Sequence, residues 1–156
     1  MKHINGLIFV LAMIVAIATG AHCQDQDELL KTPAVLSTIA QLHSHTFNAS
    51  EDKTEWSSII NEDGTVSTPY SSHDWSSNHL TVQIGSTKAI LHSHPTGVSP
   101  QPSQADLATA KKCGIPNYEI SFYYIYVAES DGKTVRKVAN LSTGKHGVLV
   151  IQWVKP

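Results

Sequence analysis

The residues best suited to chemistry lie between positions 92 and 106. His92 and His94 are two residues apart, and Ser103 and Asp106 follow after eight intervening residues. Side chains two apart on an extended strand share one face, so both imidazoles can point at one ion. Pro95 favours extended backbone at His94 and ends the strand there. The two histidines are therefore a candidate metal chelate.

Asp106 is a candidate third ligand. Residues 103–106 read SQAD at the predicted start of a helix, where a carboxylate in the first turn can face back towards the strand end. Two imidazoles, one carboxylate and an open fourth position are typical of catalytic zinc, which brings the pKa of a bound water to about 7. Ser103-x-x-Asp106 is also the pattern of an N-terminal capping box. The histidines just upstream favour the metal site.

These motifs resemble the JAMM (MPN-type, Mov34/PAD) zinc metallopeptidases, whose signature is an upstream Glu, then HxHP, then SxxD. His92-Ser93-His94-Pro95 and Ser103-x-x-Asp106 are similar to its last two parts. Bacterial RadC-like and polymorphic-toxin-associated JAMM domains look closest, because their Pro-rich stretch ending in PS is similar to PTGVSPQPS. The family usually has seven residues between the second His and the Ser, whereas this chain has eight.

The resemblance implies an upstream Glu that acts as general base. Glu28 lies near the exported N-terminus, Glu51 in a polar break and Glu62 at a turn tip. Glu55 is favoured because it opens the first predicted strand, as the family's Glu does. The resemblance further implies that Glu55 moves the proton of a zinc-activated water, and that Ser103 donates a hydrogen bond to the oxyanion.

The other histidines are predicted to be inert. His43 and His45 fall on a predicted helix, where residues two apart point to different faces and form a poor chelate. His73, His79 and His146 are expected in solvated loops. Cytidine deaminases also use His and Glu around zinc, but their HxE and PCxxC motifs are absent here.

Apolar periodicity predicts the elements that position the site. They are a helix over 33–47, hairpin strands 55–60 and 65–68, a loop over 69–79, strands 80–84 and 88–94, a Pro-rich loop over 95–102, a helix over 103–113 ended by Gly114, and strands 120–128, 134–138 and 148–154. Helices mixed with hairpins indicate an α/β or α+β fold, with packed helices on a mixed β-sheet.

The N-terminus has the pattern of a secretory signal peptide. Lys2 precedes twelve apolar residues, 7–18, and the small residues 19–21 follow them. The apolar run is short for a bilayer of about 30 Å, although an uncleaved anchor remains the alternative. Cleavage after Ala21 or after Cys23 fits equally well. We expect a signal peptide over 1–23, one domain over 24–156, a secreted or periplasmic location and no stable membrane insertion.

Composition narrows the function classes. Without residues 1–23 the chain has ten basic and thirteen acidic residues, a net charge of −3, and no basic stripe. Nucleic acid is therefore not an expected partner. Cys23 and Cys113 form no CxxC pair, which excludes a thiolate zinc finger, and they could form a disulfide only if cleavage precedes Cys23.

The combined prediction is an exported zinc peptidase or isopeptidase that hydrolyses amide bonds of a peptide or protein substrate. A non-catalytic MPN-type module that binds a protein is the alternative from another class, and an exported toxin or effector with the same fold is a third. The substrate and the oligomeric state stay open.

Overall fold

A computed structural model describes residues 27–47, 54–71 and 80–155 of the 156-residue chain. The chain divides into two compact units, Met1–Thr32 with Pro156 and Pro33–Lys155. Of the first unit only residues 27–32 are described: a helical turn begins at Asp27, and Lys31 forms an ion pair with Glu28. The predicted signal peptide lies outside the described residues.

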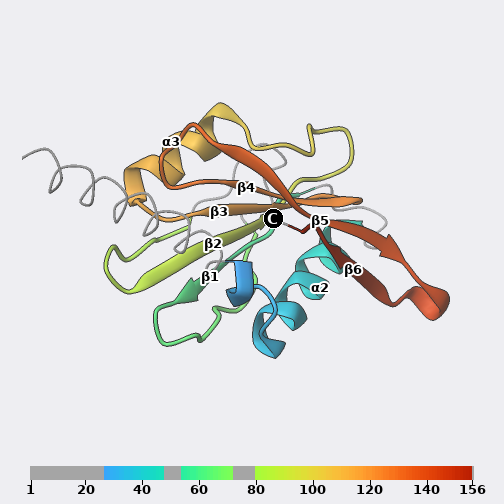
Figure 1. Cartoon of the computed structure of the whole chain (residues 1–156). Helices are drawn as coiled ribbons and strands as arrows, with labels where there is room; N and C mark the ends of the chain where they lie inside the picture. Colours follow the sequence, from blue (N-terminus) through green and yellow to red (C-terminus); the bar gives the residue numbers. More distant parts are fainter. Residues whose placement is uncertain (1–26, 48–53, 72–79, 156) are drawn as a thin grey trace, which may run out of the picture. The chain divides into compact units, whose positions relative to one another are not determined.

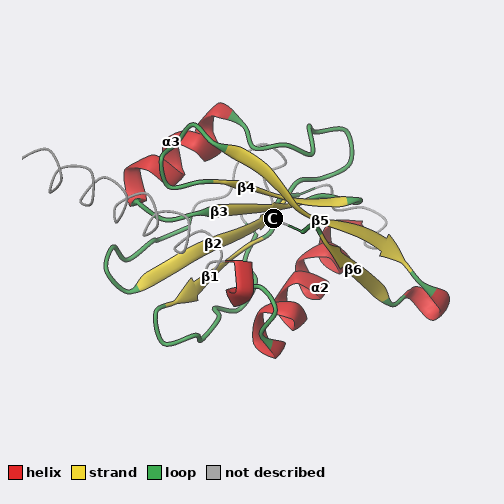
Figure 2. Cartoon of the chain, in the orientation of Figure 1, coloured by secondary structure: helices red, strands yellow, loops and turns green. Residues whose placement is uncertain are grey.

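The unit Pro33–Lys155 is a six-stranded sheet with a helix on each face (Figures 1 and 2). The strands follow the chain order, and only β2 and β3 are parallel. Their crossover is α3, while α2 precedes the sheet. The elements are α2 (Pro33–Phe47), β1 (Ser57–Asn61), β2 (Thr87–Ser93), α3 (Gln104–Cys113), β3 (Asn117–Ile120), β4 (Tyr124–Ala128), β5 (Val135–Thr143), the short 3₁₀ helix η1 (Lys145–Gly147) and β6 (Leu149–Trp153). This confirms the mixed sheet with packed helices.

The hydrophobic core lies between α2 and the sheet. Val35, Ile39 and Leu42 recur at helical spacing and are fully buried. Among the sheet residues, Leu91 is fully buried, and the next side chain on its face, Ser93, meets Thr46 of α2 in a buried hydroxyl contact. Because side chains alternate along a strand, His92 must face the opposite side of the sheet, where α3 lies.

Local signals located both helices. The predicted helix 33–47 is confirmed, and so is the helix after Ser103 that stops before Gly114. Gly114 ends α3 with a φ of +69°, a left-handed conformation that glycine adopts without a Cβ penalty. The hairpin turn at residues 61–64 is also present, and Asn61 N–H donates to the Thr65 carbonyl. The strand predicted over 65–68 is wrong, because these residues make one isolated bridge to β1, between Val66 and Ile60.

Two further strand predictions are wrong. Residues 80–83 form no strand and lead into the turn 84–86 instead. The single strand predicted over 120–128 is two strands, because Ser121 and Tyr124 close a tight turn: Ser121 N–H donates to the Tyr124 carbonyl, and Ser121 Oγ accepts from Tyr124 N–H. β3 and β4 then pair antiparallel. The aromatic run FYYIY therefore spans a turn as well as a strand.

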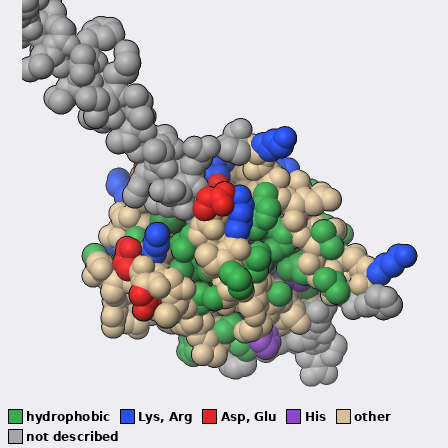
Figure 3. All heavy atoms as spheres, turned by 60° about the horizontal axis from the view of Figure 1, so that its bottom comes forward, with side chains coloured by type: hydrophobic (Ala, Val, Ile, Leu, Met, Phe, Trp, Pro, Cys, Tyr) green, Lys and Arg blue, Asp and Glu red, His purple; other side chains and the backbone are tan. Residues whose placement is uncertain are grey.

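Acidic and basic side chains lie interspersed on the face shown in Figure 3, together with apolar ones. This pattern agrees with the nearly balanced charge of the sequence. No helix within the described ranges is long and apolar enough to cross a membrane.

Candidate metal centre

The two predicted histidine ligands converge at the end of β2. His92 is in the strand and His94 follows it, and only 6% and 4% of their surfaces are exposed. Their Nε2 atoms are 2.9 Å apart. His94 N–H donates to the Ile120 carbonyl, which keeps this segment beside β3. The extended backbone thus places both imidazoles on one face, as predicted from their spacing.

Asp106 reaches the same point from the first turn of α3. Its Oδ1 lies 3.4 Å from His92 Nε2, and its Oδ2 lies 3.7 Å from His94 Nε2. The capping box is also present: Ser103 Oγ accepts from Asp106 N–H, and Asp106 Oδ2 accepts from Ser103 N–H at 2.7 Å. The two interpretations of SxxD are therefore compatible, since the cap fixes the carboxylate that faces the histidines.

Hydrogen bonds to the far nitrogens define the imidazole tautomers. His94 Nδ1 lies 2.7 Å from the Ser99 carbonyl, which can only accept, so Nδ1 carries the proton. His92 Nδ1 lies 3.0 Å from the Asn117 side-chain oxygen and donates to it in the same way. In neutral rings, both Nε2 atoms then present lone pairs.

The donor set fits a metal ion. Two Nε2 lone pairs face each other at 2.9 Å beside a carboxylate, and in these tautomers no proton lies between the two nitrogens. Zinc–nitrogen bonds of 2.0–2.1 Å at tetrahedral angles place ligand atoms about 3.3 Å apart. The observed separations of 2.9, 3.4 and 3.7 Å lie around that value. A cation would replace lone-pair repulsion with coordination, so His92, His94 and Asp106 could hold a metal ion.

The electrostatics keep His92 and Asp106 in their metal-binding forms. Burial lowers the pKa of His92, and the neighbouring His94 lowers it further, against the opposing effects of Asp106 and Asn117. Burial by itself would raise the pKa of Asp106, but His92 and the hydrogen bonds from Ser103 hold this pKa below its ordinary value. A neutral imidazole and an ionised carboxylate are the states that bind metal.

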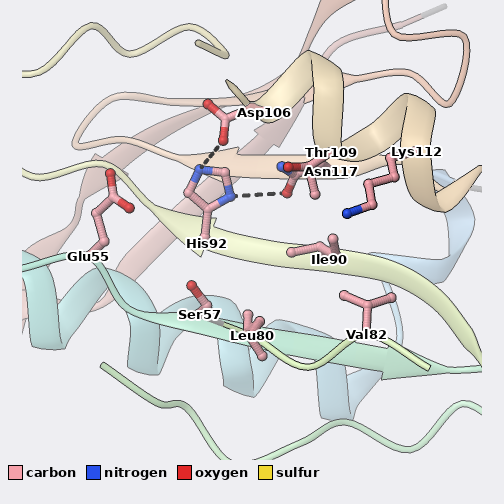
Figure 4. A pocket seen from close by; sticks show the side chains of 10 residues that line it. All are labelled: Glu55, Ser57, Leu80, Val82, Ile90, His92, Asp106, Thr109, Lys112 and Asn117. Carbon is pink, nitrogen blue, oxygen red and sulfur yellow. Dashed lines mark hydrogen bonds and ion pairs between the residues drawn. The ribbon is translucent and has the colours of Figure 1, made fainter. Parts of the chain in front are cut away.

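Glu55 lies beside this centre because the chain before β1 is tied to β2. Trp56 N–H donates to Ser93 Oγ, Ser93 N–H donates to the Trp56 carbonyl, and Ser57 pairs with His92. Continuing the antiparallel register places Glu55 opposite His94 on the same face as His92. In Figure 4 the Glu55 carboxylate points towards the side of the site where His92 and Asp106 lie.

A cavity of about 380 Å³ opens on the centre (Figure 4). It is lined by Glu55, Ser57, Leu80, Val82, Ile90, His92, Asp106, Thr109, Lys112 and Asn117. Glu55 and two of the three predicted metal ligands therefore border one space that a substrate could enter. Ser103 is not among the lining residues, and its observed role is to cap α3.

The remaining predicted candidates lie elsewhere. Glu62 is exposed in the turn after β1. His43 is buried with Nε2 3.3 Å from the Phe122 carbonyl, whereas His45 stacks on Trp56, so the two rings diverge as expected. Glu28 belongs to the unit Met1–Thr32. Glu51, His73, His79 and Cys23 lie outside the described residues, and His146 falls in the short helix η1. Within the described residues Cys113 is a free thiol.

Sequence reasoning missed two polar residues on β3, Asn117 and Glu119. Both face the side of the sheet that carries His92, because Glu119 pairs with His92 in register. Glu119 is fully buried, and neither carboxyl oxygen has a hydrogen-bond partner among the described residues. Burial, reinforced by the Asp106 carboxylate, raises the pKa of Glu119 to about 10. The alternation of Asn and Glu with Tyr and Ile over residues 117–120 was the signal that could have indicated a strand with both polar residues on one face.

The chain was also compared with known proteins. No family model matches it, and neither a curated protein nor a solved structure matches it.

Proposed function

We propose that this protein is a zinc-dependent peptidase or isopeptidase of the JAMM type. The observation that carries the proposal is the convergence of two imidazole nitrogens and one carboxylate, whose ligand atoms all lie within 4.8 Å of one another. The motifs HSHP and SxxD, which resemble the JAMM signature, contribute these three groups from the end of β2, the residue that follows it and the first turn of α3. The cavity beside them gives a substrate access.

In this proposal different residues of the chain bind the metal and transfer the proton. His92, His94 and Asp106 would hold zinc, which when bound acidifies a water and polarises a carbonyl. Glu55 accepts a proton from the attacking water and returns it to the leaving nitrogen. The carbon–nitrogen bond breaks, the carbonyl carbon gains the water oxygen, and the nitrogen gains the proton.

The same resemblance assigns Ser103 the role of the hydrogen-bond donor to the oxyanion. Its Oγ accepts the Asp106 N–H in the capping box, and this contact leaves the hydroxyl hydrogen able to donate. An oxyanion donor of this kind is worth about 10²-fold in rate. Ser103 would then combine two roles, the helix cap and the donor.

The proposal includes export to a secreted or periplasmic location, with residues 1–23 removed, and a peptide or protein as substrate. The basis for export is the sequence pattern of residues 1–23. Mass spectrometry of the exported protein tests it: a mature chain that starts after residue 21 or 23 is expected, and a mass that includes residues 1–20 contradicts it.

The test of the site begins with metal content. Wild-type protein should bind about one zinc per chain, and His92→Ala and Asp106→Ala should each lose it because three ligands form the complete protein set. His45→Ala is the matched control, since this histidine stacks on Trp56 away from the centre. Inductively coupled plasma mass spectrometry gives the stoichiometry. Stoichiometric zinc in both ligand variants would place the metal elsewhere.

The test of catalysis uses Glu55→Gln. This change removes the base but none of the ligands, so zinc content should stay the same while chelator-sensitive peptide cleavage falls by about 10²- to 10⁴-fold. Glu62→Gln, on the exposed turn, is the control. Wild-type protein that binds zinc and a protein partner but cleaves nothing, with Glu55→Gln binding that partner equally well, would favour the non-catalytic module.

A further inference from the structure

The cavity extends beyond the metal centre and changes character along its length. Glu55, His92 and Asp106 line one part, and the half-buried Leu80 and Val82 contribute an apolar wall with the buried Ile90. Lys112 lines the cavity from the last turn of α3, and Figure 4 shows its amine reaching towards Ile90. One space therefore joins the candidate reaction centre, an apolar wall and an ammonium group.

Lys112 is the one cationic side chain among the lining residues. Within the described part of the chain it has no ion-pair or hydrogen-bond partner. Asp106, Thr109 and Lys112 recur every three residues on α3, so Asp106 and Lys112 lie within about 60° on either side of Thr109. This arrangement makes the lysine available to a negatively charged group in the cavity.

Helix geometry sets the distance that a substrate must cover. Six residues at 1.5 Å per residue separate the Asp106 and Lys112 backbones by about 9 Å along α3. An extended peptide advances about 3.3 Å per residue. A carboxylate at Lys112 would therefore lie within two or three residues of a carbonyl at the metal centre, and a cavity of about 380 Å³ holds a segment of that size.

We propose that Lys112 binds a substrate carboxylate close to the scissile amide, with an apolar substrate side chain against Leu80, Val82 and Ile90. This inference rests on the proposed peptidase function and names its substrate class. The carboxylate could be the C-terminus of the substrate or an acidic side chain. In the first case the enzyme releases a fragment of two or three residues. In both cases Lys112 is a specificity-determining residue that does not touch the reacting atoms.

The experiment compares three pools of acetylated peptides that share randomised apolar positions. One pool ends in a free carboxylate, one ends in an amide, and one ends in an amide but carries glutamate as the penultimate residue. Mass spectrometry measures kcat/KM for each pool with zinc-loaded wild type, Lys112→Ala and Lys111→Ala. Lys111 is exposed on the same turn but does not line the cavity, which makes it the matched control.

We expect at least one carboxylate-bearing pool to be cleaved about tenfold better than the neutral amide, as a charge-assisted hydrogen bond gives. Lys112→Ala should abolish this preference, mainly by raising KM, because the lost contact is the same in the ground state and the transition state. Lys111→Ala should keep it. The pool that shows the preference identifies the source of the carboxylate.

Two results would overturn the inference: equal cleavage of all pools by wild type, or a preference that survives Lys112→Ala. Titration calorimetry with the same pools separates this failure from that of the proposed function. If zinc-loaded wild type cleaves no pool, the peptidase proposal fails. Binding of the carboxylate pools that depends on Lys112 would then still support the carboxylate site, and binding that ignores the carboxylate would refute it.

Discussion

Asn117 connects the metal ligands to the sheet behind them. Its side-chain oxygen accepts from His92 Nδ1 at 3.0 Å, and this contact sets the tautomer whose Nε2 faces the centre. Both residues are almost fully buried, so losing this hydrogen bond would leave a buried polar group unpaired, which costs free energy. The orientation of His92 therefore depends on a residue from β3 as well as on its own strand.

We expect Asn117→Ala to weaken zinc binding by about 10- to 100-fold, which is the usual cost of losing a hydrogen bond to a ligating histidine. Competition with a chromophoric chelator measures the affinity. Asn140→Ala, on β5, changes the same side-chain type at a residue that does not line the cavity, and it should bind zinc like wild type. Equal affinities for both variants would show that Asn117 does not orient the ligand.

At the scale of elements, α3 matters because its first turn carries a ligand. Ser103 and Asp106 cap each other through two hydrogen bonds, and both interactions are local in sequence. The cap therefore defines where the helix starts and, with it, where the carboxylate lies. One short segment serves both the fold and the candidate site.

Substitutions of Ser103 separate its two roles. Ser103→Ala should lower the free energy of unfolding by about 1 kcal/mol because it removes an N-cap, and it should also slow peptide cleavage. Ser103→Asn supplies an equally good cap without the hydroxyl, so stability should recover while cleavage stays slow. Urea denaturation and steady-state kinetics measure the two effects. Recovery of both in Ser103→Asn would mean that the hydroxyl acts only as a cap.

Features that depend on interactions local in the sequence were predicted, whereas features that depend on contacts between distant segments were not. His92, His94, Ser103 and Asp106 could be placed because strand alternation and helix capping are local signals. The turn at Ser121 was missed because the aromatic residues on either side of it favour strands. Because of this error β3 was not predicted as a separate strand, and the face on which it carries Asn117 and Glu119 was not predicted either. Which strand lies beside β2 is a tertiary fact that no local pattern encodes.

For the molecule as a whole, Glu119 makes stability depend on pH. Below pH 4.5, its ordinary pKa, the side chain is protonated in both the folded and the unfolded chain. Between 4.5 and about 10 the unfolded chain releases the proton, whereas the buried folded carboxyl keeps it. The folded state then binds more protons, so the free energy of unfolding falls as the pH rises.

The neutral isostere Glu119→Gln removes this dependence of the free energy of unfolding on pH. The comparison uses metal-free protein, so that metal binding does not contribute to the measured stability. We expect the free energy of unfolding of Glu119→Gln, relative to that of wild type, to be lowest at pH 4.5 and to grow with pH, by at most about 1.4 kcal/mol per unit. Urea midpoints at pH 4.5, 7 and 9 give the comparison. Glu62→Gln, exposed to water, should follow wild type at every pH. A difference between Glu119→Gln and wild type that stays constant with pH would contradict this prediction, because it would show that the Glu119 carboxyl ionises in the folded chain near its ordinary pKa.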